Sequence, residues 1–285
     1  MKVYQNFSLQ EFNAYKIKSF CRIAYFPENE EDFIKLFSLL DINNFIIIGN
    51  GNNLILSKEY YTTPFIILNG TFNKVEVDNN YLIAEASATT LDICKIALLN
   101  NLSGIEFLYD IPSSVGGAVF MNAGTKEGVI EDVLYKVRYL DLIDLSIKEI
   151  YKDELNLSYR NSFFQEDKNK IILKAWFKLI PGDNYNIENL MDSIKKRRWS
   201  KQPREFPNCG SVFKRPPGKY VGPMIDELKL RGYTVGGAQI SNKHSGFIVN
   251  INNATGENIL NLIDIVKLKV LEKFNLNLEV EQRII

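Results

Sequence analysis

Prolines frame a short segment in the last third of the chain and restrict what it can fold into. Pro207 precedes this segment, and the Pro216–Pro217 pair follows it. Because proline lacks a backbone donor and fixes φ, neither flank can continue a helix or a central strand. Between the prolines stand Gly210, Ser211 and Lys214. One interpretation is a surface turn; the other is a stiff segment that presents the Ser211 hydroxyl, near a cation, to a ligand.

The composition predicts folded domains. The chain has 285 residues, enough for two domains with their own cores, and 46% of them are apolar. Lys plus Arg equals Asp plus Glu at 34 each, so the charge balance indicates neither a nucleic-acid nor a membrane partner. No run approaches the ~18 apolar residues of a membrane span, and the N-terminus has no apolar signal core. We expect a soluble, cytoplasmic protein that is a monomer.

Histidine and cysteine are too scarce for several classes of site. His244 is the only histidine, and Cys21, Cys94 and Cys209 are widely spaced, with no CxxC pair. We therefore expect no metal site and reduced thiols. A Ser-His-Asp hydrolase would need His244 and a GxSxG elbow, which the chain lacks. Acid–base chemistry must then use Ser, Glu, Asp, Lys, Tyr or Cys.

Apolar periodicity predicts a mixed α+β chain. We expect helices at 28–40, 91–99, 186–199 and 256–273. We expect strands at 45–48, 54–56, 65–69, 74–77, 81–85, 133–140, 147–150, 171–180 and 246–251. A turn at 181–183 suggests a boundary between a larger unit, 1–182, and a smaller one, 183–285. The basic cluster 195–198 fits either phosphate binding or, as we favour, a solvated helix face.

One glycine- and asparagine-rich segment could bind an anion. It consists of Gly49, Asn50, Gly51, Asn52 and Asn53, between two apolar runs. Gly and Asn tolerate positive φ, so successive amides could turn inward as an anion-binding nest. A hairpin turn is the alternative. The segment is not a dinucleotide-binding fingerprint, because no helix is expected after it.

A second segment is dominated by small residues. Its members are Ile111, Pro112, Ser113, Ser114, Gly116, Gly117, Ala118 and Asn122. Small side chains let the backbone approach a ligand closely, and they also let a strand pack closely on a helix. Both interpretations stay open for this segment when it is considered alone.

Together these two segments resemble the patterns GxGSN and IPGxxGGAxxMNAG of the UDP-N-acetylenolpyruvoylglucosamine reductase (MurB) family. The resemblance implies a vanillyl-alcohol-oxidase-type FAD-binding domain followed by a smaller α+β substrate-binding domain, with both segments contacting FAD. Asn52 replaces a serine of the first pattern, and Ser113 replaces a glycine of the second. Residues 13–19 match an NTxxxGG-like pattern without its two glycines. These departures concern the detailed FAD contacts.

Three more segments resemble the same family. Residues 157–163 match YRxSxF, residues 201–217 match (S)KxP followed by GSxFK, and residues 278–285 match LxPEVRxIG. The resemblance makes Arg160 the substrate-activating arginine, Ser211 the proton donor and Glu281 the catalytic glutamate. It also implies that the substrate contacts Tyr159, Lys201 and Lys214. His244, within a KHSGF segment, is then structural.

The activity implied by the resemblance is reduction of the enolpyruvyl group of UDP-N-acetylglucosamine enolpyruvate to UDP-N-acetylmuramate. Bound FAD and NADPH serve as cofactors, and the UDP-sugar is the partner. This is a step of peptidoglycan precursor synthesis. Two alternatives remain: another flavoprotein of the same FAD-domain superfamily, or a non-catalytic nucleotide-sugar sensor. Taken singly, Arg160 could form a surface salt bridge and Glu281 could be a solvated tail residue.

Overall fold

The structure is a computed structural model that describes residues 1–285. The chain divides into two compact units, each built from separate stretches of sequence. Unit 1 contains residues 1–4, 23–50 and 63–198, and unit 2 contains residues 5–22, 51–62 and 199–285. The boundary expected after residue 182 falls inside unit 1, which continues to Arg198.

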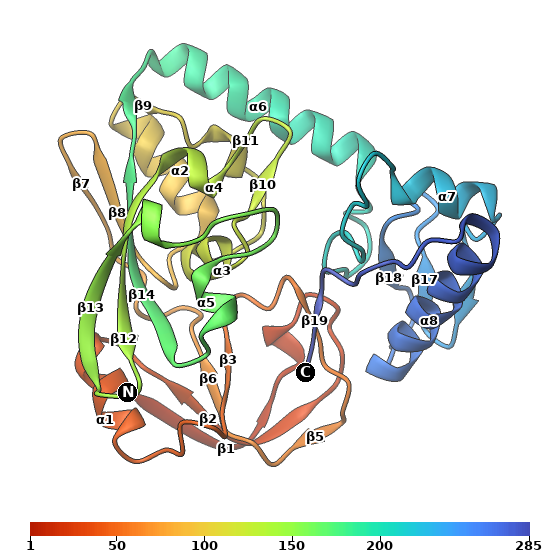
Figure 1. Cartoon of the computed structure of the whole chain (residues 1–285), viewed down its shortest axis with the longest axis horizontal. Helices are drawn as coiled ribbons and strands as arrows, with labels where there is room; N and C mark the ends of the chain where they lie inside the picture. Colours follow the sequence, from red (N-terminus) through yellow and green to blue (C-terminus); the bar gives the residue numbers. More distant parts are fainter. The chain divides into compact units, whose positions relative to one another are not determined.

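An antiparallel five-stranded sheet forms the centre of unit 1 (Figure 1). Its order is β13 (Ser146–Tyr151), β12 (Leu134–Asp141), β14 (Lys170–Lys178), β8 (Tyr81–Glu85) and β7 (Val75–Asp78). Successive side chains of a strand point to opposite faces. Leu173, Ala175 and Phe177 of β14 are fully buried, so one face of this strand lies in the core.

Short helices cover that sheet. The helices α2 (Thr90–Leu99), α3 (Val115–Phe120) and α5 (Phe163–Glu166) pack against β8 or β14. Figure 1 shows α2 and α3 on the same side of the sheet. The helix α4 (Ile130–Val133) leads directly into β12. Thr89 caps α2 by accepting a hydrogen bond from the Asp92 amide, which favours a helix start there.

Parallel strands form a second sheet. In it β6 (Phe65–Ile67) lies between β2 (Phe20–Phe26) and β3 (Ile46–Ile48), parallel to both. Parallel strands need a crossover, and α1 (Glu30–Phe37) supplies it between β2 and β3. Asn29 caps α1, and three acidic residues in its first turn suit the helix dipole. The sheet ends with β1 (Lys2–Ser8) at one edge and β3 at the other, and β5 (Tyr60–Tyr61) pairs with β2.

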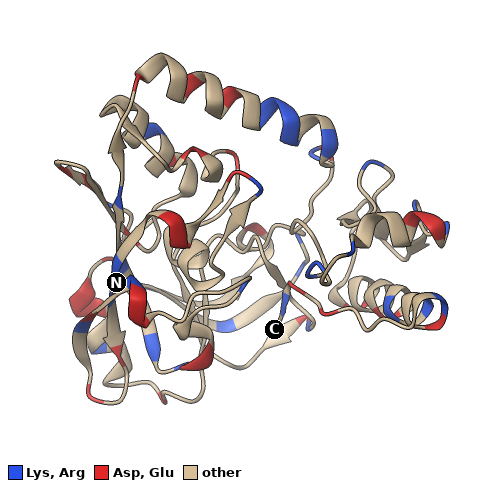
Figure 2. Cartoon of the chain, turned by 45° about the horizontal axis from the view of Figure 1, so that its top comes forward, with Lys and Arg blue, Asp and Glu red and all other residues tan.

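The long helix α6 (Asn184–Lys201) carries the basic cluster near its end (Figure 2). Arg197 forms an ion pair with Glu127 at 2.6 Å, and Arg198 forms one with Asp110 at 3.3 Å. All four residues belong to unit 1. Two members of the cluster therefore fasten α6 to its own unit, and cations near a helix C-terminus are also favoured by its dipole.

In unit 2, one helix packs on a small antiparallel sheet. The sheet contains β16 (Thr234–Val235), β17 (Ala238–Ile240) and β18 (Ile248–Asn250), and α8 (Gly256–Phe274) packs on its first two strands. The buried stripe of α8 is Ile259, Leu262, Ile263, Val266 and Val270. Unit 2 also contains α7 (Val221–Glu227) and the parallel pair β4 (Leu54–Ile55) and β19 (Arg283–Ile284).

The remaining elements are short. Two-residue strands pair as β9 (Leu102–Ser103) with β15 (Ile180–Pro181), and as β10 (Gly124–Thr125) with β11 (Gly128–Val129). The 3-10 helices are Gln10–Phe12, Glu106–Leu108 and Lys152–Glu154. None of the helices is long and apolar enough to cross a bilayer.

The predicted α+β class is confirmed, and every predicted helix and strand is present. Four short helices were not expected: α3, α4, α5 and α7. Of these, α3 contains Gly116 and Gly117, and α7 contains Gly222 and Pro223. Gly and Pro lower helix propensity, so tertiary contacts determine these two short helices.

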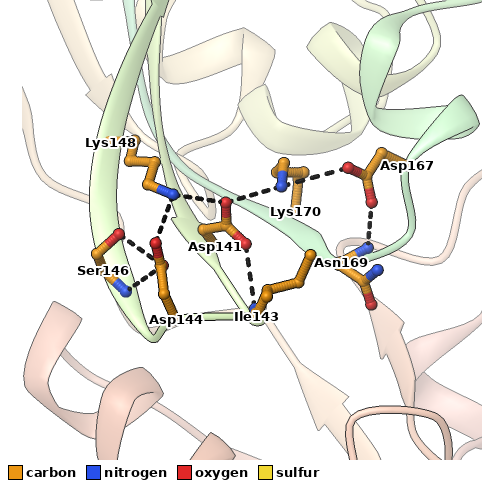
Figure 3. Close-up of polar contacts among 8 residues, drawn as sticks. All are labelled: Asp141, Ile143, Asp144, Ser146, Lys148, Asp167, Asn169 and Lys170. Carbon is orange, nitrogen blue, oxygen red and sulfur yellow. Dashed lines mark hydrogen bonds and ion pairs between the residues drawn. The ribbon is translucent and has the colours of Figure 1, made fainter.

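A cluster of charged side chains fastens the end of the β12–β13 hairpin (Figure 3). The Asp141 carboxylate, which is only 7% exposed, accepts hydrogen bonds from Lys148 and Lys170, each at 2.8 Å. Lys148 also pairs with Asp144 at 2.6 Å. Burial favours the neutral form of Asp141, but the two lysines outweigh it and hold the pKa of Asp141 below its ordinary value.

We predict that Asp141→Asn lowers the unfolding midpoint at neutral pH by about 3 °C or more, because two lysines lose a shared carboxylate. A lowered folded-state pKa contributes stability that is present above the unfolded pKa and lost as pH falls through the folded pKa. The variant should therefore lose less stability than wild type on acidification. Asp144→Asn, in a side chain that is 49% exposed, is the control and should shift the midpoint less. Thermal unfolding at several pH values provides the measurement, and equal shifts in both variants would contradict the prediction.

Candidate functional site

Within unit 1, the loop after β3 lies against the start of α3. A Cβ atom added to Gly49 would lie 2.3 Å from the Oγ of Ser114. Ser114 is the N-cap of α3, and its side chain accepts a hydrogen bond from the Gly117 amide at 3.2 Å. Parts of the two segments predicted to bind FAD are therefore in contact. A larger residue at position 49 would have to displace the Ser114 side chain.

Main-chain hydrogen bonds fix the second segment. Thr90 N donates to Ser113 O at 2.9 Å, and Gly116 N donates to Ala86 O at 2.8 Å. A Cβ at Gly116 would lie 3.1 Å from the Cβ of Ala86. Close packing is thus one reason for Gly116. Ser113 is outside the left-handed region, so serine fits where the family pattern has glycine.

The segment 49–53 is not a hairpin turn, because the strands on either side pair elsewhere. β3 pairs with β6, and β4 pairs with β19. Among these five residues only Gly51 has a positive φ, +66°, and its added Cβ would lie 2.1 Å from the Phe12 carbonyl oxygen. The Asn53 side chain donates from Nδ2 to Glu281 O at 3.2 Å. This loop therefore also supports the C-terminal segment within unit 2.

The residues of unit 1 in these two segments fit a flavin cofactor. Gly49, Asn50 and residues 113–118 carry no acidic side chain. The contact of Gly49 with Ser114 keeps the loop close to the first turn of α3. The first amides of α3 are already bonded within the protein, since Gly116 N donates to Ala86 O and Gly117 N donates to Ser114 Oγ. What the segment offers a ligand is therefore close approach to its small residues. The individual FAD contacts named in the sequence analysis stay a prediction.

The C-terminal end of α3 supports the turn that contains Arg160. Asn122 is buried; its side-chain amide donates to Ser158 O at 3.0 Å, and its oxygen accepts from the Glu131 amide at 3.1 Å. Ser162 Oγ donates to Phe120 O at 2.7 Å. The Asn122 side chain thus holds this turn, a role that its sequence pattern did not indicate. Its contact with FAD stays a prediction.

Arg160 lies in a strained backbone conformation. Its φ is +56°, and a two-residue turn places it between Ser158 and Asn161, which hydrogen-bond to each other. Its guanidinium donates to Gly124 O at 3.2 Å and lies 5.3 Å from the ring centre of Tyr159. Non-glycine residues with positive φ are uncommon and cluster at functional sites. Twelve other non-glycine residues of the chain also have a positive φ, so the functional role of Arg160 stays a prediction.

Ser211 and Glu281 are brought together within unit 2. Ser211 forms a β-bridge with Phe247, and Val212 N donates to Gly246 O at 3.0 Å. On the other side, Glu281 N donates to Val212 O at 2.8 Å. The proline-framed segment is therefore extended and pairs with residues 246–247 on one side and with Glu281 on the other. Ser211 itself is exposed, as the second interpretation of this segment requires.

The cations near Ser211 differ in their partners. Lys214 forms an ion pair with Glu279 at 2.6 Å. Burial lowers the pKa of His244, and the charges of Arg231 and Lys201 add to this effect. His244 Nδ1 accepts from the Gly246 amide at 3.2 Å and its ring packs on Phe247 at 4.6 Å, which supports the structural role expected for it.

Two family models match the chain. The C-terminal domain of UDP-N-acetylenolpyruvoylglucosamine reductase matches residues 202–285, and an FAD binding domain matches residues 22–144. The first of these matches begins four residues after the end of the last stretch of unit 1, at Arg198.

Similar proteins span the whole chain. A UDP-N-acetylenolpyruvoylglucosamine reductase of Francisella tularensis is 41% identical over 98% of this chain and 98% of its own. One of Caldanaerobacter subterraneus is 38% identical over 100% of this chain and 94% of its own. The crystal structure of the reductase (MurB) from Thermus caldophilus has a TM-score of 0.85 and 27% identity, covering 99% of this chain and 98% of that one.

We predict that Gly49→Ala lowers the flavin content of the purified protein, because the new methyl group would collide with Ser114 and displace the loop. The ratio of flavin to protein absorbance gives the measurement. Gly222→Ala is the matched control, since the nearest atom to its added Cβ is 3.4 Å away. A normal flavin content in both variants would show that the loop at Gly49 does not shape the flavin site.

Proposed function

The chain belongs to the UDP-N-acetylenolpyruvoylglucosamine reductase family and is an FAD-dependent oxidoreductase, and from this premise we propose that Arg160, Ser211 and Glu281 perform its reductive step. The reaction reduces the enolpyruvyl group of UDP-N-acetylglucosamine enolpyruvate. We further propose NADPH as the reductant and the cytoplasm as the place of reaction. The observation that carries the proposal is the pairing of the Ser211 segment with the Glu281 segment in unit 2.

The chemistry requires donors for developing negative charge. When bound, reduced FAD supplies the hydride that adds to the terminal methylene carbon of the enol ether, and NADPH reduces the flavin again. Negative charge then builds on the adjacent carbon and on the substrate carboxylate. Preorganised donors directed at that charge lower the barrier, and removing one donor typically costs ~3 kcal/mol.

Arg160 would bind the substrate carboxylate. Its guanidinium is planar and permanently charged, which suits a carboxylate. The carbonyl of Arg160 accepts from the Gln165 side chain at 3.0 Å, and Asn122 holds the neighbouring Ser158. Both ends of the turn are therefore fixed before substrate binds, so little reorganisation is required at the moment of reaction.

Glu281 would donate to the developing charge in its protonated form, because an ionised carboxylate would repel that charge. Its main-chain N–H donates to Val212 O at 2.8 Å, and its carbonyl accepts from the Asn53 side chain at 3.2 Å. The side chain is partly buried. A fixed backbone limits the positions that this carboxyl group can reach.

Ser211 would deliver the proton to the carbon next to the ether oxygen. A serine hydroxyl is a weak acid, so a nearby cation must assist it. Lys214 is already paired with Glu279. Lys201, the other lysine that the family pattern names, is therefore our candidate for this assistance. Tyr159, exposed beside Arg160, and Lys214 remain proposed substrate contacts.

We predict that Ser211→Ala leaves flavin reduction by NADPH nearly unchanged and slows flavin reoxidation by the enolpyruvyl substrate by a factor on the order of 10² or more. The reason is that proton delivery belongs only to the second half-reaction. Stopped-flow absorbance of the flavin measures each half-reaction separately. Ser38→Ala, an exposed serine of unit 1, is the control. An equal decrease in the rates of both half-reactions would contradict the assigned role of Ser211.

A further inference from the structure

A buried side-chain amide lies directly behind the Ser211 segment. Gln282 follows Glu281 in sequence and is 3% exposed, and Tyr15 beside it is fully buried. Both belong to unit 2, as do Ser211 and Glu281. The family pattern quoted above has valine at the position of Gln282. The amide is therefore a feature of this chain that the resemblance does not explain.

The side-chain amide of Gln282 lies within hydrogen-bond distance of three main-chain carbonyls. Its Nε2 lies 3.1 Å from Cys209 O and 3.4 Å from both Gly210 O and Ser211 O. Successive residues of a strand alternate in direction. The positive φ of Gly210, +76°, breaks that alternation and lets successive carbonyls approach one donor group.

Tyr15 fixes the orientation of that amide. Its hydroxyl donates to Gln282 Oε1 at 3.0 Å. Burial, aided by the neighbouring Cys209, raises the pKa of Tyr15 well above its ordinary value, so the hydroxyl keeps its proton. With a donor on the Oε1 side and only carbonyls on the Nε2 side, the amide has one favourable orientation.

The same amide links Ser211 to the Glu281 segment. Gln282 holds the Ser211 carbonyl through its side chain, and the preceding residue, Glu281, donates its amide to Val212 O at 2.8 Å. This pair of adjacent residues thus binds carbonyls before Ser211, those of Cys209 and Gly210, and carbonyls after its Cα, those of Ser211 and Val212. The position of Ser211 is coupled to that of Glu281 through a buried network.

We propose that Gln282 and Tyr15 are positioning residues that hold Ser211 at the place from which it delivers its proton. This inference rests on the proposed function, because it concerns the same hydroxyl. Neither residue is assigned contact with the substrate. Their effect on the reaction passes through Ser211.

Four proteins test the proposal: wild type, Ser211→Ala, Gln282→Val and the double variant Ser211→Ala/Gln282→Val. Gln282→Val should slow flavin reoxidation by UDP-N-acetylglucosamine enolpyruvate by roughly ten- to hundredfold, as a misplacement near 1 Å does. Flavin reduction by NADPH and flavin content should stay near wild type. In the Ser211→Ala background, Gln282→Val should cause no further slowing, because the hydroxyl that it positions is absent.

The cycle separates the possible failures. An equal factor of slowing in both backgrounds, or none in wild type, would overturn the positioning role. Loss of both half-reactions together with flavin would show a structural role only and would also overturn it. If Ser211→Ala itself reoxidises flavin at the wild-type rate, the proposed function of Ser211 fails, and the positioning role fails with it. Tyr15→Phe, which keeps the amide, serves if Gln282→Val does not fold, and should slow reoxidation several-fold with reduction unchanged.

Discussion

Main-chain pairing of the C-terminal residues is the constraint on which the rest of unit 2 depends. Residues 279–285 hydrogen-bond on one side to residues 212–214 and on the other to residues 53–57. Ile285 O also accepts from the Tyr61 hydroxyl at 2.7 Å and from Ser57. Three stretches that are far apart in sequence are thereby joined. Ser211, Glu281 and Asn53 have defined positions relative to one another only because of this pairing.

Unit 1 depends in a comparable way on the short helix α3. Its N-cap, Ser114, contacts Gly49. At its other end, Phe120 and Asn122 hydrogen-bond to the turn that contains Arg160. The segment proposed to bind FAD and the arginine proposed to bind substrate are thus connected through six helical residues. Because a short, well-packed helix moves little, the proposed FAD-binding segment and Arg160 share one rigid support.

Much of the fold could be predicted because apolar periodicity marks each long element. The stripe of α8 and the apolar run of β14 both stand where the pattern places them. The helix α3 could not be predicted, because Gly116 and Gly117 disfavour it locally and packing against Ala86 decides the outcome. The division into units was also missed. Residues 5–22 and 51–62 join residues 199–285 through long-range pairing, which no local pattern reveals.

The candidate site was predictable to a different degree at each position. Arg160, Ser211 and Glu281 lie in segments that resemble a known family, so they could be named from sequence. The supporting side chains could not. Gln282 looks like a polar tail residue, and Asn122 like part of a small-residue segment, yet both are buried with their amides fully engaged. Burial of a polar group depends on partners from distant parts of the chain, which sequence alone does not show.

The most direct test of the whole account is to follow the flavin through one complete cycle of the wild-type protein. Under anaerobic conditions, one equivalent of NADPH is added first and UDP-N-acetylglucosamine enolpyruvate second, while the flavin absorbance is recorded. The account predicts bleaching by NADPH followed by return of the oxidised spectrum when the substrate is added. A flavin that bleaches and stays reduced with this substrate, or a protein that purifies without flavin, would contradict it.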